Sequence, residues 1–226
     1  MAVEKWTRER RLERTRTALL DAATHVFARD GFHGASLDEI AETAGFTRGA
    51  IYKHFDGKED LLFATYDRVN DRMLQAFADQ IEDEPRGTDP RAVAATWRKL
   101  LAEDSELFAI NLEFQLYHLR NPSARERATT QRRRTRQMVA EFLRTHAPVT
   151  GGTLKSDPDT VAGILLATSD GFVQAAQADP KDADLYESFL ELFLPAVMME
   201  DRPKRSSSTT SAGRARTRRA SGKGSG

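Results

Sequence analysis

The sequence contains no cysteine among its 226 residues. This absence excludes disulfide bonds, thiolate metal sites and cysteine nucleophiles. No stretch of the sequence approaches the roughly 18 apolar residues that a membrane-spanning helix needs. The charged segment 1–16 is not followed by the apolar core of a signal peptide. We therefore expect a cytoplasmic protein with no membrane partner.

Histidine is also scarce, with five residues in the chain. These residues show no spacing typical of a metal site, and no Ser–His–Asp or paired-carboxylate arrangement stands out. We therefore expect no metal, no other cofactor and no catalytic residues. The sequence does not predict an enzyme.

The two signs of charge are unevenly distributed, although 34 basic and 34 acidic residues give a net charge of zero. Residues 201–226 hold eight Lys and Arg residues and one Asp, which leaves 26 basic and 33 acidic residues before them. This segment is rich in Ser, Thr and Gly and has no apolar anchors, so we expect a disordered basic tail. A basic tail on an acidic body suggests an anionic partner.

Apolar residues recur at helical spacing almost throughout the chain, and no segment alternates convincingly like a strand. The pattern predicts an all-α fold with about nine helices. We expect a first helix that ends near residue 30, a long fourth helix that starts near residue 58, and others at about 36–44, 48–55, 90–104, 106–120, 123–145, 158–178 and 183–199.

A pair of short helices is predicted near the N-terminus. Ser36 and Glu39 form a capping box at the start of the first, Gly45 turns the chain, and Thr47 can cap the second. Two short helices joined by a glycine turn are typical of a helix-turn-helix, whose second helix enters the major groove of DNA. The residues that this second helix leaves exposed are predicted to be Arg48, Gly49, Tyr52, Lys53 and His54.

The run 35–62, ASLDEIAETAGFTRGAIYKHFDGKEDLL, resembles the DNA-binding signature of the TetR family nearly residue for residue. The preceding residues 27–32, FARDGF, also fit the family pattern, and the match covers roughly residues 15–65. The resemblance implies an N-terminal three-helix helix-turn-helix DNA-binding domain, 1–57, and a larger C-terminal helical domain, 58–200, for effector binding and dimerisation. The basic tail, 201–226, is not part of the family pattern.

The resemblance also assigns roles to individual residues. It implies that Thr47, Tyr52 and Lys58 contact DNA phosphates, and Gly49, which has no side chain, allows close approach to the groove. Arg48 and Lys53 are expected to read bases, because an arginine can bind guanine through two hydrogen bonds. The alternative is a structural helix pair with an exposed charged face, but packing alone does not require Gly49, Tyr52 and Lys58 together.

The helix predicted over 106–120 is apolar nearly all round, which is typical of a buried helix. Its polar residues are spaced by four and three positions and therefore share one face. Such a stripe can line a ligand pocket, or it faces solvent or is satisfied within the core. We predict a pocket for a small, largely apolar effector, because TetR-family proteins usually bind effectors in the C-terminal domain. The predicted ligand-binding residues are Trp97, Phe108, Asn111, Phe114, Gln115, His118 and Met138.

Gly171 lies within the helix predicted over 158–178, where glycine costs about 1 kcal/mol relative to alanine. Close approach of a second helix would explain this residue; the alternative is a tolerated glycine. We therefore expect the last two helices to form a homodimer interface. The candidate interface residues are Thr168, Phe172, Phe189 and Phe193. A two-fold dimer predicts a palindromic double-stranded DNA operator with half-sites about 34–36 Å apart.

The predicted function is that of a ligand-responsive transcriptional regulator, with repression as the default that the family resemblance implies. The alternative is a constitutive or nucleoid-type DNA-binding protein. Such a protein would share the helix-turn-helix and the tail but would lack an effector pocket.

We hypothesise that the basic tail, together with Arg10, Arg11, Arg14 and Arg16, supplies a sequence-independent attraction to DNA; the alternative is a solubilising or vestigial extension that never touches DNA. Residues 1–60 hold ten Lys and Arg residues against eleven Asp and Glu, so this region gains little non-specific attraction from its own charge. Each phosphate contact steepens the dependence of log affinity on log salt concentration by about 0.9. A chain that ends at residue 200 should therefore bind all DNA sequences more weakly and with a shallower salt slope.

The same truncation should leave the discrimination between operator and random DNA unchanged. Fluorescence anisotropy titrations at several salt concentrations measure the affinity and the slope together. If truncation leaves both quantities as they were, the tail takes no part in DNA binding.

Overall fold

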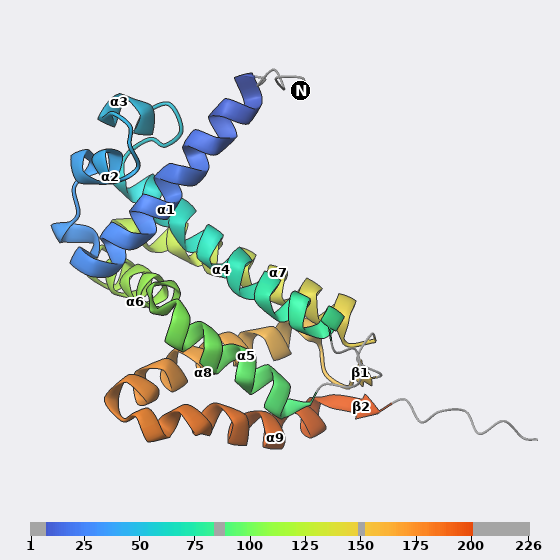
Figure 1. The fold of residues 1–226 in the computed structure, drawn as a ribbon. Coiled ribbons are helices and arrows are strands. Elements are labelled where there is room, and N and C mark those ends of the chain that lie inside the picture. The colour runs from blue at the N-terminus through green and yellow to red at the C-terminus, as the bar shows by residue number, and fades with distance from the viewer. Residues whose placement is uncertain (1–7, 84–88, 149–151, 201–226) are drawn as a thin grey trace, which may run out of the picture.

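The computed structural model describes residues 8–83, 89–148 and 152–200. Within these residues the chain forms nine α-helices, as the sequence predicts (Figure 1). The helices are α1 (Arg8–Gly34), α2 (Leu37–Thr43), α3 (Arg48–Ile51), α4 (Lys58–Asp83), α5 (Pro90–Glu103), α6 (Ser105–Arg120), α7 (Arg125–His146), α8 (Pro158–Ala178) and α9 (Leu185–Val197). Two short 3₁₀ turns, Pro122–Ala124 and Pro180–Asp184, precede α7 and α9. The predicted tail, 201–226, lies outside the described residues.

Local capping explains where several helices begin. The Ser36 hydroxyl accepts a hydrogen bond from the Glu39 amide at 3.0 Å, and the Asp157 carboxylate accepts one from the Thr160 amide at the same distance. These contacts satisfy amides that have no partner within the helix. The Glu39 carboxylate pairs with Arg29 instead of completing the predicted capping box.

Two predicted boundaries are wrong, and the chain contains strands that the sequence analysis missed. The helix predicted over 48–55 ends at Ile51, because the amides of Lys53 and His54 bond carbonyls only three residues back and tighten the chain into turns. The last helix ends at Val197, where β2 (Met198–Glu200) pairs antiparallel with β1 (Gly152–Leu154). Strands of three residues are too short to show an alternating pattern.

The helix-turn-helix lies at one end of the molecule, and α8 and α9 lie at the other (Figure 1). We call α1 to α3 the head and α4 to α9 the body. The two share one core, in which Leu19 and Ile40 of the head belong to the same buried cluster as Ile110 and Phe114 of α6. The boundary predicted between residues 57 and 58 coincides with the start of α4, but the core is continuous across it.

The prediction that α6 is buried nearly all round is only partly correct. Leu107, Ile110 and Phe114 are at most 1% exposed, whereas Leu112 is 39% and Leu119 is 67% exposed. The helices α1, α4, α5 and α8 contact α6 along part of its circumference and leave the remaining face to solvent. None of the helices in the described part of the chain is long and apolar enough to cross a membrane.

Candidate functional site

The α2–α3 unit is held together by a small apolar contact and a tight turn. Ile40 and Ile51 are fully buried, and the Phe46 amide donates to the Ala41 carbonyl at 2.8 Å. Gly45 in the turn has a φ of 75°, a region that favours glycine. This packing fixes the angle between the two helices and leaves the outer face of α3 in solvent.

Arg48 and Tyr52 form the centre of that outer face. Tyr52 is 53% exposed, and its hydroxyl accepts a hydrogen bond from the Arg48 guanidinium at 3.1 Å. The same guanidinium pairs with Asp38 at 3.0 Å. An exposed ion pair of this kind is weak, so the guanidinium can exchange Asp38 for another acceptor at little cost.

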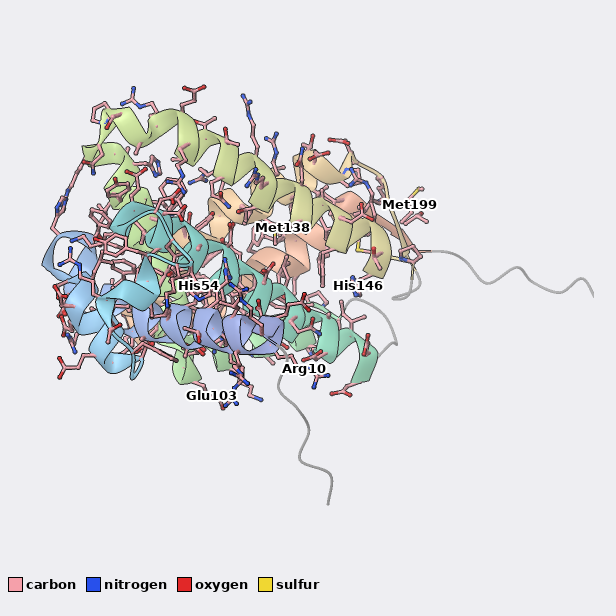
Figure 2. The ribbon with its side chains drawn as sticks, turned by 90° about the horizontal axis from the view of Figure 1, so that it is seen from above. Arg10, His54, Glu103, Met138, His146 and Met199 are labelled. Carbon is pink, nitrogen blue, oxygen red and sulfur yellow. The ribbon has the colours of Figure 1, made fainter. Side chains whose placement is uncertain are left out.

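Apart from Lys58, the other predicted DNA-binding residues lie in α3 or directly beside it in the chain. Thr47 occupies the N-cap position, but its side chain makes no capping bond and its hydroxyl is therefore not used by the helix. A methyl group at Gly49 would meet only the Thr47 hydroxyl, at 3.7 Å, so the protein itself leaves room for a side chain there. Lys53 and His54 line a hollow between the α2–α3 unit and the start of α1; His54 is labelled in Figure 2.

Lys58 is placed differently from the other predicted DNA-binding residues. Its ammonium donates to the Ala35 carbonyl at 2.8 Å and lies 4.6 Å from the centre of the Phe32 ring. Burial lowers the pKa of this lysine. The structure thus shows Lys58 bound within the protein, where it ties the start of α4 to the end of α1.

A junction between α6 and the head was missed by the sequence analysis. The Glu113 carboxylate accepts a hydrogen bond from the Phe32 amide at 2.7 Å, directly after the turn at Gly31. The Tyr117 hydroxyl donates to Glu59 at 2.8 Å, and its ring lies 4.3 Å from that of Phe32. Burial and the Glu59 carboxylate raise the pKa of Tyr117 to about 12, so the phenol remains a donor. The sequence signal that could have indicated this junction is Glu113, a carboxylate in the middle of α6 with apolar residues on both sides of it in the sequence.

A cavity of about 180 Å³ lies in the body and is lined by residues of α4, α5, α7, α8, α9 and the two strands. Its walls are mainly aliphatic and aromatic, and they contain no Asp, Glu, Lys or Arg among the described residues. Of the predicted ligand-binding residues, Trp97 alone lines this cavity. His146, at the end of α7, also lines it near the strands (Figure 2).

Three other predicted residues line a separate, smaller cavity of about 50 Å³ between α4, α6, α7 and α8. They are Phe108, Asn111 and Gln115. The Gln115 amide donates to the Asp170 carboxylate, whose pKa is raised by burial. The smaller cavity is therefore polar and partly closed by its own hydrogen bonds.

The remaining predicted ligand-binding residues line neither cavity. Phe114 is completely buried and stacks on Tyr66 with a ring separation of 4.0 Å. A ring nitrogen of His118 pairs with the Phe114 carbonyl at 2.9 Å, and Met138 is half-buried on α7. The predicted polar stripe is thus split, because α6 packs on different neighbours along its length.

The predicted interface residues gather on α8 and α9. The ring of Phe189 lies 5.2 Å from that of Phe172 and 4.9 Å from that of Phe193. The Thr168 hydroxyl donates to the Ile164 carbonyl at 2.8 Å. These four side chains are half-buried within one chain, and more exposed apolar residues lie beside them: Leu192 at 79% and Ile164 at 40%.

Gly171 lies on the same surface of α8, and a side chain there would meet nothing within 4 Å. The fold of one chain therefore does not require glycine at this position. Among the described residues, no group of three or more His, Asp or Glu side chains could hold a metal ion.

Comparison with known proteins agrees with this geometry. Residues 19–65 match the family described as bacterial regulatory proteins, tetR family. The transcriptional repressor AcnR of Corynebacterium diphtheriae is 29% identical over 190 residues, which span 82% of this chain and 93% of that protein.

Solved structures share the fold over most of the chain. SmeT of Stenotrophomonas maltophilia, the repressor of the multidrug efflux pump SmeDEF, has a TM-score of 0.50 and 27% identity over 82% of this chain and 91% of its own. A TetR-family member from Streptomyces coelicolor has a TM-score of 0.60 and 23% identity over 80% of this chain and 98% of its own. The helix-turn-helix and its match to the family model show that residues 19–65 form a DNA-binding region of the TetR family of bacterial transcriptional regulators, and the solved structures share the fold of most of the chain.

Proposed function

We propose that this chain is a homodimeric repressor that binds a palindromic operator and is released by a small, largely apolar effector. The observation that carries the proposal is the exposed outer face of α3, where Arg48 and Tyr52 lie side by side at the end of the molecule opposite the cavity. The relatives AcnR and SmeT are named as repressors, which supports repression. Action on chromosomal DNA fits a cytoplasmic location.

The proposed DNA contact starts from the N-terminal end of α3. Arg48 exchanges Asp38 for the edge of a guanine, while Thr47 and Tyr52 bond phosphates on either side. Gly49 lets the backbone approach the groove, and Lys53 and His54 extend the contact toward α1. Lys58 reaches a phosphate only by leaving the Ala35 carbonyl, so in this proposal its first role is to position the head.

The proposed dimer forms through α8 and α9. Leu192 is 79% exposed, more than any other large apolar side chain in the described part of the chain, and Ile164 lies on the neighbouring helix. A second copy packed against these two helices would form a four-helix bundle and cover both residues. The open space beside Gly171 gives the partner helix a place for close approach.

The proposed effector acts from the cavity through α6. One side of this helix carries Phe108, Asn111 and Gln115 at the smaller cavity, and the Phe108 ring also lies 6.0 Å from that of Trp97 in the wall of the larger one. Another side carries Glu113 and Tyr117 at the head. A ligand that fits better when α6 has moved shifts the population toward heads that fit DNA less well. The cavity therefore favours ligand-responsive regulation over the alternative of a constitutive or nucleoid-type protein.

Replacing Gly49 by alanine tests the DNA contact. The protein has room for this methyl group, and alanine is the better helix former, so the stability of the fold should not fall. The added methyl group keeps α3 away from the groove, and affinity for genomic fragments selected by the natural protein should fall by about tenfold or more. Thermal unfolding and gel-shift titration measure the two effects. Full affinity in Gly49→Ala would contradict the proposed docking of α3.

Replacing Leu192 by glutamate tests the dimer. A carboxylate placed in the centre of an apolar interface should leave a monomer at micromolar concentration and remove the preference for palindromes. Leu119→Glu is the matched control, since Leu119 is also exposed but lies on α6 and not on the two helices of the proposed interface. Sedimentation velocity gives the oligomeric state of both variants. A dimer that survives Leu192→Glu would place the interface elsewhere.

A further inference from the structure

We infer that the 180 Å³ cavity takes an uncharged, mainly apolar molecule with one hydrogen-bond acceptor for Trp97 and one donor for Gln80. The inference rests on the proposed function, because it names the chemical class of the effector. Two observations support it: the cavity wall has no Asp, Glu, Lys or Arg side chain among the described residues, and it contains two buried polar atoms without hydrogen-bond partners.

Within the described part of the chain, the wall has no acidic or strongly basic side chain that could neutralise a charged ligand. Its described residues include no carboxylate, ammonium or guanidinium group. A charge buried without a partner is strongly unfavourable, so carboxylates, phosphates and alkylammonium ions are poor occupants. The aliphatic and aromatic side chains that make up most of the wall favour a hydrocarbon skeleton.

Most polar groups of the wall are already satisfied by the protein. The Asn70 amide donates to the Tyr66 carbonyl at 2.7 Å, and the Ser169 hydroxyl donates to the Leu166 carbonyl at 3.1 Å. A ring nitrogen of His146 pairs with the Phe142 carbonyl at 2.8 Å. Asn70, Ser169 and His146 therefore do not depend on a ligand for a hydrogen-bond partner.

Trp97 and Gln80 are different, because each buries a polar atom without a partner in the described part of the chain. Trp97 is 1% exposed, and its indole N–H makes no hydrogen bond. The side-chain oxygen of Gln80, on α4, is likewise buried and unpaired. Natural folds rarely leave such groups unsatisfied, and both belong to the wall of the same cavity.

The two groups have opposite requirements. An indole N–H only donates, so the ligand must bring an acceptor to Trp97, such as a carbonyl or hydroxyl oxygen. The Gln80 oxygen only accepts, so the ligand must bring an O–H or N–H to it. The Trp97 ring is held by Tyr186 at 4.8 Å and Phe108 at 6.0 Å between ring centres, which fixes the direction of its N–H.

The test uses three probes with the same chain length: 1-octanol, which donates and accepts; 2-octanone, which only accepts; and octanoate, which is charged. Isothermal titration calorimetry with the full-length protein, without DNA, measures binding. We expect octanoate to bind at least about tenfold more weakly than 1-octanol. Trp97→Phe should weaken 2-octanone by about fivefold, the usual effect of one neutral hydrogen bond.

Gln80→Leu distinguishes the hydrogen bond that the ligand donates to Gln80 from the one that it accepts from Trp97. It should weaken 1-octanol by about fivefold and leave 2-octanone unchanged or tighter, because the ketone has no donor for Gln80. Gln75→Leu is the matched control: Gln75 lies on the same helix, but its amide bonds Asp79 outside the cavity, at 2.7 Å. Gln80→Leu also keeps the test decisive if Trp97→Phe does not fold.

Three results would overturn the inference: octanoate binding as tightly as 1-octanol, an equal effect of Gln80→Leu on the alcohol and the ketone, or no saturable binding of any probe. None of them would affect the proposed operator binding, which is tested separately with Gly49→Ala. Loss of operator binding, in turn, would leave the probe results as they are.

Discussion

The hydrogen bond from the Phe32 amide to the Glu113 carboxylate is the contact on which the arrangement of head and body depends. The chain can turn at the end of α1 because Gly31 adopts a φ of 69°. A side chain at Gly31 would also come within 3.2 Å of the same carboxylate, so the turn and its acceptor fit each other closely. A hydrogen bond to a charged acceptor is stronger than a neutral one. Because Phe32 lies near the end of α1 and Glu113 in the middle of α6, this hydrogen bond fixes the end of α1 against α6.

This junction gives α6 two sets of neighbours that are far apart in the sequence. Towards the head it carries Glu113, which bonds the Phe32 amide, and Tyr117, whose ring packs on that of Phe32; towards α8 it carries Gln115, which bonds Asp170. The shared core means that a shift of α6 cannot be absorbed by a flexible link between two separate domains. In the proposed repressor, ligand binding in the body therefore changes the angle of the head by moving a packed helix.

The sequence predicted well those features that depend on neighbouring residues. The capping bond of Ser36 and the glycine turns are local, and the structure confirms them. The sequence did not predict which residues line the 180 Å³ cavity, because its wall combines side chains from five helices. The packing of these helices on one another is not visible in the periodicity of any one of them. Phe114 was expected in a ligand pocket but lies in the core, and Lys58 was expected to face DNA but bonds Ala35.

Hydrogen exchange in the Glu113→Ala variant tests the central role of the junction most directly. Mass spectrometry of peptides that cover residues 31–36 and α6 reports the protection of both sides of the contact. If the junction holds head and body together, exchange should become faster by about tenfold or more in both segments, because they lose a shared charged hydrogen bond. Glu126→Ala, which removes an exposed carboxylate from α7, should change neither segment. Unchanged exchange in Glu113→Ala, or a change confined to one segment, would contradict the account.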